Sequence, residues 1–174
     1  MGRLDINDKL RVISVFLQDQ PGALFRVTGL IRRRGFNIDT LAVGPSETPG
    51  YSRMTLTIDA GRAYADQVAK QIGRLEDVTE VSDITDDHRI EREMALLQMR
   101  LTSPEQHAQA LQAVLEVGAR VVDESDGVLV VEVTGFFDVV EAAIAALGAY
   151  NITELCRSGP LAIRKAATPE VAPA

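Results

Sequence analysis

Residues 12–43 read VISVFLQDQPGALFRVTGLIRRRGFNIDTLAV, and this stretch decides the fold. Its first part, Val12–Leu17, is rich in β-branched and apolar residues, as is typical of a strand. After a polar break, Leu24, Val27, Leu30 and Ile31 recur at the spacing of one helical face. Gly35 ends this pattern, and Phe36–Val43 is again strand-like. The stretch therefore predicts a strand, a loop, a helix, a tight turn and a second strand.

The loop before this helix is the feature of most chemical interest. Pro21 suits a first helical turn, because its φ matches a helix and its missing N–H is not needed there. The first N–H groups of the helix, at Gly22, Ala23 and Leu24, lack partners within it and suit a carboxylate. Glycine at position 22 would let a ligand approach the backbone closely. The alternative is an ordinary strand-to-helix connection with Asp19 as the capping residue.

A ligand site in this loop leads to two further expectations. Asn37 starts the next strand, and it can join the site only if that strand folds back suitably. Gly22→Asp should prevent binding, because the new side chain blocks the approach and repels a carboxylate. Folding should suffer little, since a helix N-terminus favours negative charge, provided that Gly22 does not need a positive φ.

Composition indicates a soluble globular protein. The chain has 174 residues, enough for one large or two small domains, with 46% apolar and 25% charged residues. Its net charge of −7 argues against nucleic acid or membrane as a partner. The single cysteine, Cys156, excludes an internal disulfide and is expected to be a small core residue. No early segment resembles a secretory or spanning sequence, so we expect a cytoplasmic location.

The same order of elements is predicted twice along the chain. The first copy continues with an alternating strand at Tyr51–Asp59, a second amphipathic helix and a polar strand that ends near Ile84. The second copy has a helix begun by Ser103 and Pro104 and a hairpin at Asp126-Gly127. The order βαββαβ predicts an antiparallel sheet with two helices on one face. The expected fold class is α+β, with two tandem ferredoxin-like units.

The charged stretch 83–93, DITDDHRIERE, is the natural boundary between the two units. We predict a polar N-terminal tail at 1–10, a first unit at 11–85 and a second unit at 86–165. The Ala- and Pro-rich tail at 166–174 is expected to be disordered.

No catalytic or metal-binding residues are indicated. His88 in the charged linker and His107 on a helix have no thiol or second imidazole at ligand spacing, so both are expected at the surface. No phosphate-binding loop, dinucleotide fingerprint or nucleophile elbow is present. Arg32, Arg33 and Arg34 suit the C-terminal end of a helix dipole better than a phosphate site.

Three motifs in order carry a family resemblance: DQPGALFRV at 19–27, RRGFNIDTL at 33–41 and YSRMTL at 51–56. Together they resemble the ACT domain of the acetolactate synthase small, regulatory subunit. The similarity runs from about Arg11 to Arg164, and it includes the linker DHRIERE and the closing ELCRSG at 154–159.

The resemblance implies a non-catalytic partner that activates the catalytic large subunit. Thiamine diphosphate, Mg and FAD are expected on that large subunit, and no cofactor is expected on this chain. It also implies a homodimer whose ACT domains, at 11–85, bind valine or another branched-chain amino acid between them for feedback inhibition. The residues that match the effector site are Asp19, Gly22 and Asn37, and the expected site also includes Ala23, Leu24 and Ile38. Some members have Asn where this chain has Asp19.

The sequence leaves two other kinds of function open. A free-standing ACT-type amino-acid sensor would control another enzyme or a transcription regulator, and a DNA-binding regulator would need a recognition helix or a basic face. A free-standing enzyme on the same sheet would need a catalytic constellation. Neither feature is visible in the sequence, although fold alone does not exclude either function.

Overall fold

The first unit has the predicted order of elements. The structure is a computed structural model, and it describes residues 10–59, 61–86 and 89–165. The elements of this unit are β1 (Leu10–Gln18), α1 (Ala23–Arg33), β2 (Ile38–Pro45), β3 (Tyr51–Asp59), α2 (Arg62–Ile72) and β4 (Val78–Asp83). The strands form an antiparallel sheet in the order β2-β3-β1-β4. This is the split βαβ arrangement that the sequence predicts.

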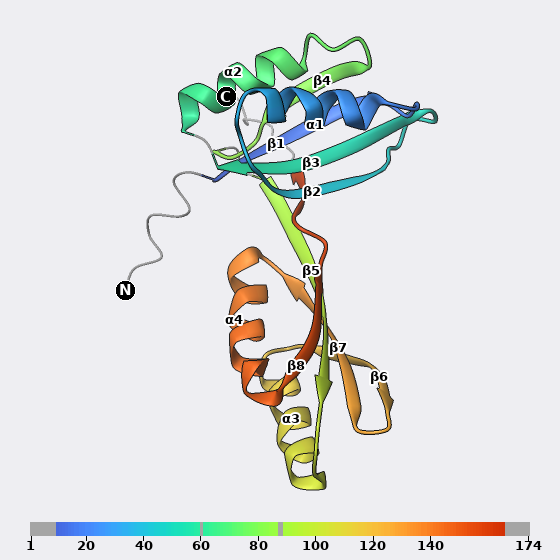
Figure 1. The fold of residues 1–174 in the computed structure, drawn as a ribbon, viewed down its shortest axis with the longest axis vertical. Helices are drawn as coiled ribbons and strands as arrows, with labels where there is room; N and C mark the ends of the chain where they lie inside the picture. Colours follow the sequence, from blue (N-terminus) through green and yellow to red (C-terminus); the bar gives the residue numbers. More distant parts are fainter. Residues whose placement is uncertain (1–9, 60, 87–88, 166–174) are drawn as a thin grey trace, which may run out of the picture. The chain divides into compact units, whose positions relative to one another are not determined.

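Both helices of the first unit cover the same face of its sheet (Figure 1). β1 alternates, so that Ile13, Val15 and Leu17 lie in the core with Val27 and Ile31 of α1. The α2 residues in this core are Ala65, Val68 and Ile72. Alternate residues of the strand thus pack against the residues on one face of each helix, and together they form one buried hydrophobic layer.

The second unit repeats this plan. Its elements are β5 (Arg89–Arg100), α3 (Pro104–Glu116), β6 (Arg120–Ser125), β7 (Val128–Gly135), α4 (Phe137–Leu147), a 3₁₀ turn (Gly148–Tyr150) and β8 (Ile152–Arg157). The strands lie in the order β6-β7-β5-β8, and α3 and α4 pack on one face (Figure 1). Ser103 caps α3 by accepting a 3.2 Å hydrogen bond from the N–H of Gln106. The predicted hairpin turn has positive φ at both Asp126 and Gly127.

The division between the units differs from the predicted one at 85/86. Among the described residues, those up to Ile90 form one compact unit together with 162–165, and Glu91–Leu161 form the other. β5 begins at Arg89, inside the stretch expected to be a linker. A short strand that the sequence did not indicate, β9 (Leu161–Arg164), pairs with β5. The predicted disordered tail lies outside the described residues, as does the N-terminal tail apart from Leu10, which begins β1.

Candidate effector site

The loop before α1 has a backbone that the sequence did not reveal. Gly22 is the N-cap of α1 and has φ +90° and ψ −13°, in the left-handed region that favours glycine. The helix begins at Ala23, so the prediction that Pro21 occupies its first turn is wrong. The alternative that Asp19 caps the helix is also wrong, because no side chain caps α1.

The loop is held from both sides by residues far away in the sequence. The N–H of Asp19 donates a 2.8 Å hydrogen bond to the carbonyl of Gly50, just before β3. The Asp77 carboxylate, only 4% exposed, accepts hydrogen bonds from the Arg26 guanidinium and the Gln20 amide. The Arg26 hydrogen bond, with that of Gln20, holds the pKa of Asp77 below its usual range. Asp77 therefore fixes the loop to the start of β4.

The N–H groups at the start of α1 are not all available. The N–H of Ala23 donates to the carbonyl of Gln20 at 3.2 Å, which corrects the expectation that it would face a ligand. The first full helical hydrogen bond runs from the N–H of Arg26 to the carbonyl of Gly22, at 2.9 Å. The N–H groups of Leu24 and Phe25 precede it, so they are the ones that the first turn can offer to an anion.

Leu24 lies on the flank of α1 that faces away from β4. Successive residues of a helix are about 100° apart, so Leu24 and Arg26 point to opposite flanks. Arg26 reaches Asp77 at the start of β4, which places Leu24 on the flank toward β2. Leu24 is 42% exposed, and Val43 of β2 is 44% exposed although it lies on the helix-covered face. These two side chains give this edge of the unit an apolar surface.

Within one chain, the structure does not bring Asn37 and Ile38 to the loop. β1 ends beside the start of β3, where Gln18 pairs with Tyr51, and the loop follows there. Ile38 pairs with Ile58 near the other end of β3. The two ends are separated by most of a nine-residue strand, roughly 20 Å at about 3.3 Å per residue. The condition that the strand folds back to the loop is therefore not met within a single chain.

Gly22→Ala should destabilise the first unit, because alanine at φ +90° is strained by about 1–2 kcal/mol. The added Cβ would also meet the Arg26 guanidinium at 2.9 Å, and Arg26 is held by Asp77. Urea denaturation measures the change in the free energy of unfolding. Gly29→Ala, in the same helix with ordinary φ, is the matched control and should be neutral or stabilising.

The sequence-based expectation that Gly22→Asp leaves folding intact does not hold for this backbone. Equal stability of the two alanine variants would contradict this account of Gly22.

In the part of the chain that the structure describes, no three His, Cys, Asp or Glu side chains are placed to hold a metal. His107 is partly buried and lies 2.8 Å from the Glu124 carboxylate, and His88 lies outside the described residues. Cys156 is exposed, which corrects the expectation that it is a core residue. Among the helices described, none has the length and apolar character that a membrane span requires.

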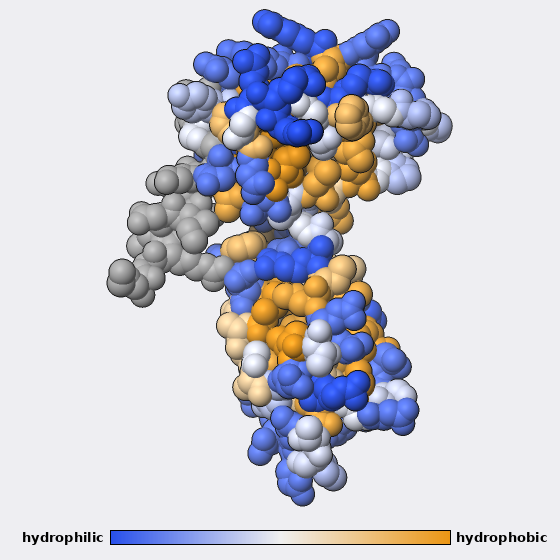
Figure 2. All heavy atoms as spheres, in the orientation of Figure 1, coloured by the Kyte–Doolittle hydropathy of each residue, from blue (hydrophilic) through white to orange (hydrophobic). Residues whose placement is uncertain are grey.

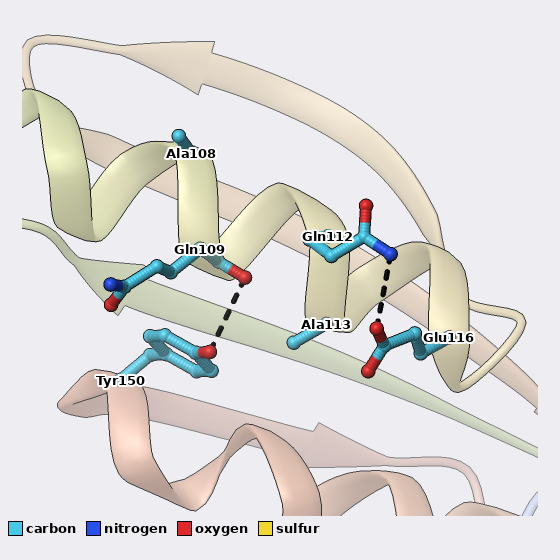
Figure 3. Close-up of a pocket in the computed structure, with 6 residues that line it drawn as sticks. All are labelled: Ala108, Gln109, Gln112, Ala113, Glu116 and Tyr150. Atoms are coloured by element: carbon cyan, nitrogen blue, oxygen red, sulfur yellow. Dashed lines mark hydrogen bonds between the residues drawn. The ribbon is translucent and has the colours of Figure 1, made fainter.

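A shallow pocket of about 420 Å³ lies between α3 and the 3₁₀ turn of the second unit (Figure 3). Its polar contacts are internal, since Tyr150 Oη donates to the Gln109 carbonyl at 3.3 Å and the Gln112 amide donates to Glu116 at 3.0 Å (Figure 3). Ala108 and Ala113 complete the lining. The lining has one carboxylate and no base or nucleophile beside it, so it offers no catalytic pair.

The fold and the loop define an ACT-type regulatory unit followed by a second ferredoxin-like unit. Residues 13–80 match the family model for the AHAS small subunit-like ACT domain, and residues 92–166 match the model for the small subunit of acetolactate synthase. The chain belongs to the acetolactate synthase small-subunit family.

Individual relatives and a solved structure agree with this assignment. The probable acetolactate synthase small subunit of Archaeoglobus fulgidus is 39% identical over 87% of this chain and 94% of its own length. That of Methanothermobacter thermautotrophicus is 35% identical over 93% and 96%. The crystal structure of the small subunit from Thermotoga maritima superposes with a TM-score of 0.80 at 33% identity, covering 90% of this chain and 97% of that one.

Proposed function

We propose that this chain activates the catalytic large subunit of acetolactate synthase and makes it sensitive to valine or another branched-chain amino acid. Family membership supports the regulatory role. The observation that carries the effector proposal is that the loop and Asn37 lie at opposite ends of the sheet within one chain. They can therefore form one site only if the loop of one chain meets Asn37 of a second copy.

The edge strand β2 provides the geometry for such a pair. Two identical edge strands related by a two-fold axis normal to the sheet pair in antiparallel fashion. The start of β2 in the partner then lies beside the end of β2 in this chain, where Pro45 pairs with Ser52. That is the end of the sheet at which the loop lies, so Asn37 of the partner subunit comes to the loop. Figure 2 shows hydrophobic side chains along this edge, which a dimer would cover.

The groups that would line this shared site are complementary to an amino-acid effector. The N–H groups of Leu24 and Phe25 suit the carboxylate of the ligand, aided by the helix dipole. The Asp19 carboxylate and the amide oxygen of Asn37 accept hydrogen bonds from an ammonium group. Leu24 and Val43 offer an apolar wall to an aliphatic side chain, whose burial contributes about 1.5–3 kcal/mol. Because such a site is shared by two subunits, binding of the amino acid would be coupled to the arrangement of the two subunits.

Co-purification with a large subunit tests the activating role. We expect the isolated chain to produce no acetolactate, and the large subunit to turn over faster when the chain is added. Valine should lower the activity of the complex toward that of the large subunit alone. Synthase activity in the pure chain, or an unchanged rate in the complex, would contradict the proposal.

A further inference from the structure

The face of the first sheet that the helices leave uncovered carries a second pocket, of about 270 Å³. Residues paired across strands share a face, so Ser14 of β1 and Ser82 of β4 lie side by side on this outer face. In the next row, Phe16 lies between Glu80 of β4 and Arg53 of β3. The two serines line the pocket, with the two charged residues beside them.

Arg53 is held in place by its neighbours. Its guanidinium lies 5.0 Å above the centre of the Phe16 ring and 2.9 Å from the Glu47 carboxylate. Phe16 in turn stacks on Tyr51, with the ring centres 5.1 Å apart. A guanidinium fixed in this way can receive a carboxylate with little loss of side-chain freedom.

Another wall of the pocket is formed by β9. This strand follows the second unit in the sequence but belongs to the first unit from Ala162 on. Ala162 is buried in a small apolar cluster with Val12 and Ile84. Ile163 and Arg164 of β9 also line the pocket. The wall is therefore apolar along Ile84, Ala162 and Ile163 and positively charged at its end.

We propose that this pocket binds a small zwitterion of the α-amino acid class with a short aliphatic side chain. Arg53 suits its carboxylate, Glu80 and Glu47 suit its ammonium group, and the apolar wall of β9 suits its side chain. The serine hydroxyls can donate to the carboxylate or accept from the ammonium group. The volume lies just below the range usual for ligand pockets, which fits a ligand of this size. This pocket shares no residue with the loop or with Asn37, so it does not depend on the proposed effector site.

Amide NMR shifts of the full chain test the proposal, with L-alanine, L-valine and L-leucine as probes at millimolar concentration. We expect the amides of Ser14, Ser82 and Ile163 to shift with at least one of them, and to do so equally in an Asn37→Ala variant. Two matched probes separate the charges of valine, since 3-methylbutanoate lacks the ammonium group and 2-methylpropylamine lacks the carboxylate. Neither should shift these amides.

Variants then locate the site. Glu80→Gln should weaken binding roughly fivefold, because it removes one exposed charged acceptor. Ser82→Leu should abolish binding by filling the pocket, and Glu154→Gln in the second unit should change nothing. Undisturbed pocket amides with all three amino acids would overturn the proposal. So would binding of 3-methylbutanoate as tight as that of valine, because one charge would then suffice.

Discussion

Mixed dimers of two variants that are each defective in valine binding should regain one intact valine site per dimer. Leu24→Glu should prevent binding, because its carboxylate lies where the ligand carboxylate approaches the first turn of α1. Asn37→Ala should weaken binding by removing a hydrogen-bond partner. In the heterodimer, one site combines both changes, but the other combines an unchanged loop with an unchanged Asn37. The expectation follows from the roughly 20 Å between loop and Asn37 within one chain.

Calorimetry on a heterodimer purified with two different tags measures this directly. The expected stoichiometry is one valine per heterodimer with wild-type affinity, and no wild-type site in either parent homodimer. A heterodimer with both changes on the same chain is the matched control. It contains no fully intact site, because each of its two sites lacks one element. No recovery in the first heterodimer would show that the site is not shared across the two-fold axis.

Arg157→Met should destabilise the second unit selectively, because it leaves a buried carboxylate without its counterion. Glu93 is 2% exposed, and Arg157 holds it with two hydrogen bonds of 2.7 and 2.9 Å. Arg157 also donates to Glu141 and lies 5.3 Å from the centre of the Phe137 ring. The hydrogen bonds to Glu93 raise the pKa of Arg157 most, and the hydrogen bond to Glu141 raises it further. Breaking a buried pair costs about 3–5 kcal/mol, and the partial exposure of Arg157 points to the lower end.

Hydrogen exchange resolves where this destabilisation falls. Amides of β5 and β7 should lose protection in Arg157→Met, whereas those of β1 and β3 should keep it and serve as an internal control. The double variant Glu93→Gln/Arg157→Met should recover part of the loss, because the buried group is then neutral. A uniform change in both units, or no recovery in the double variant, would contradict this role of the ion pair.

Local chemistry in the sequence determined most of the elements and the order in which they follow one another along the chain. α1 follows from the spacing of Val27, Leu30 and Ile31, which are all buried. Ser103 and the Asp126-Gly127 turn acted as predicted because capping and tight turns depend on a few neighbouring residues. The motifs around Gly22 and Gly35 were likewise sufficient to indicate the family.

Tertiary structure alone decided how the candidate site is arranged. Gly22 has a positive φ because the loop is tied to Gly50 and Asp77, which lie about 30 and 55 residues away, and no local pattern reports such partners. β9 is four residues long and is fixed by Ala162 against Val12 and Ile84, so its sequence carries no periodic signal. Asn37 and the loop are close in sequence, yet the pairing of β2 with β3 puts them at opposite ends of the sheet. The sequence indicated the candidate site residues. Strand register decided which of them can come together, because register is set by packing over the whole sheet.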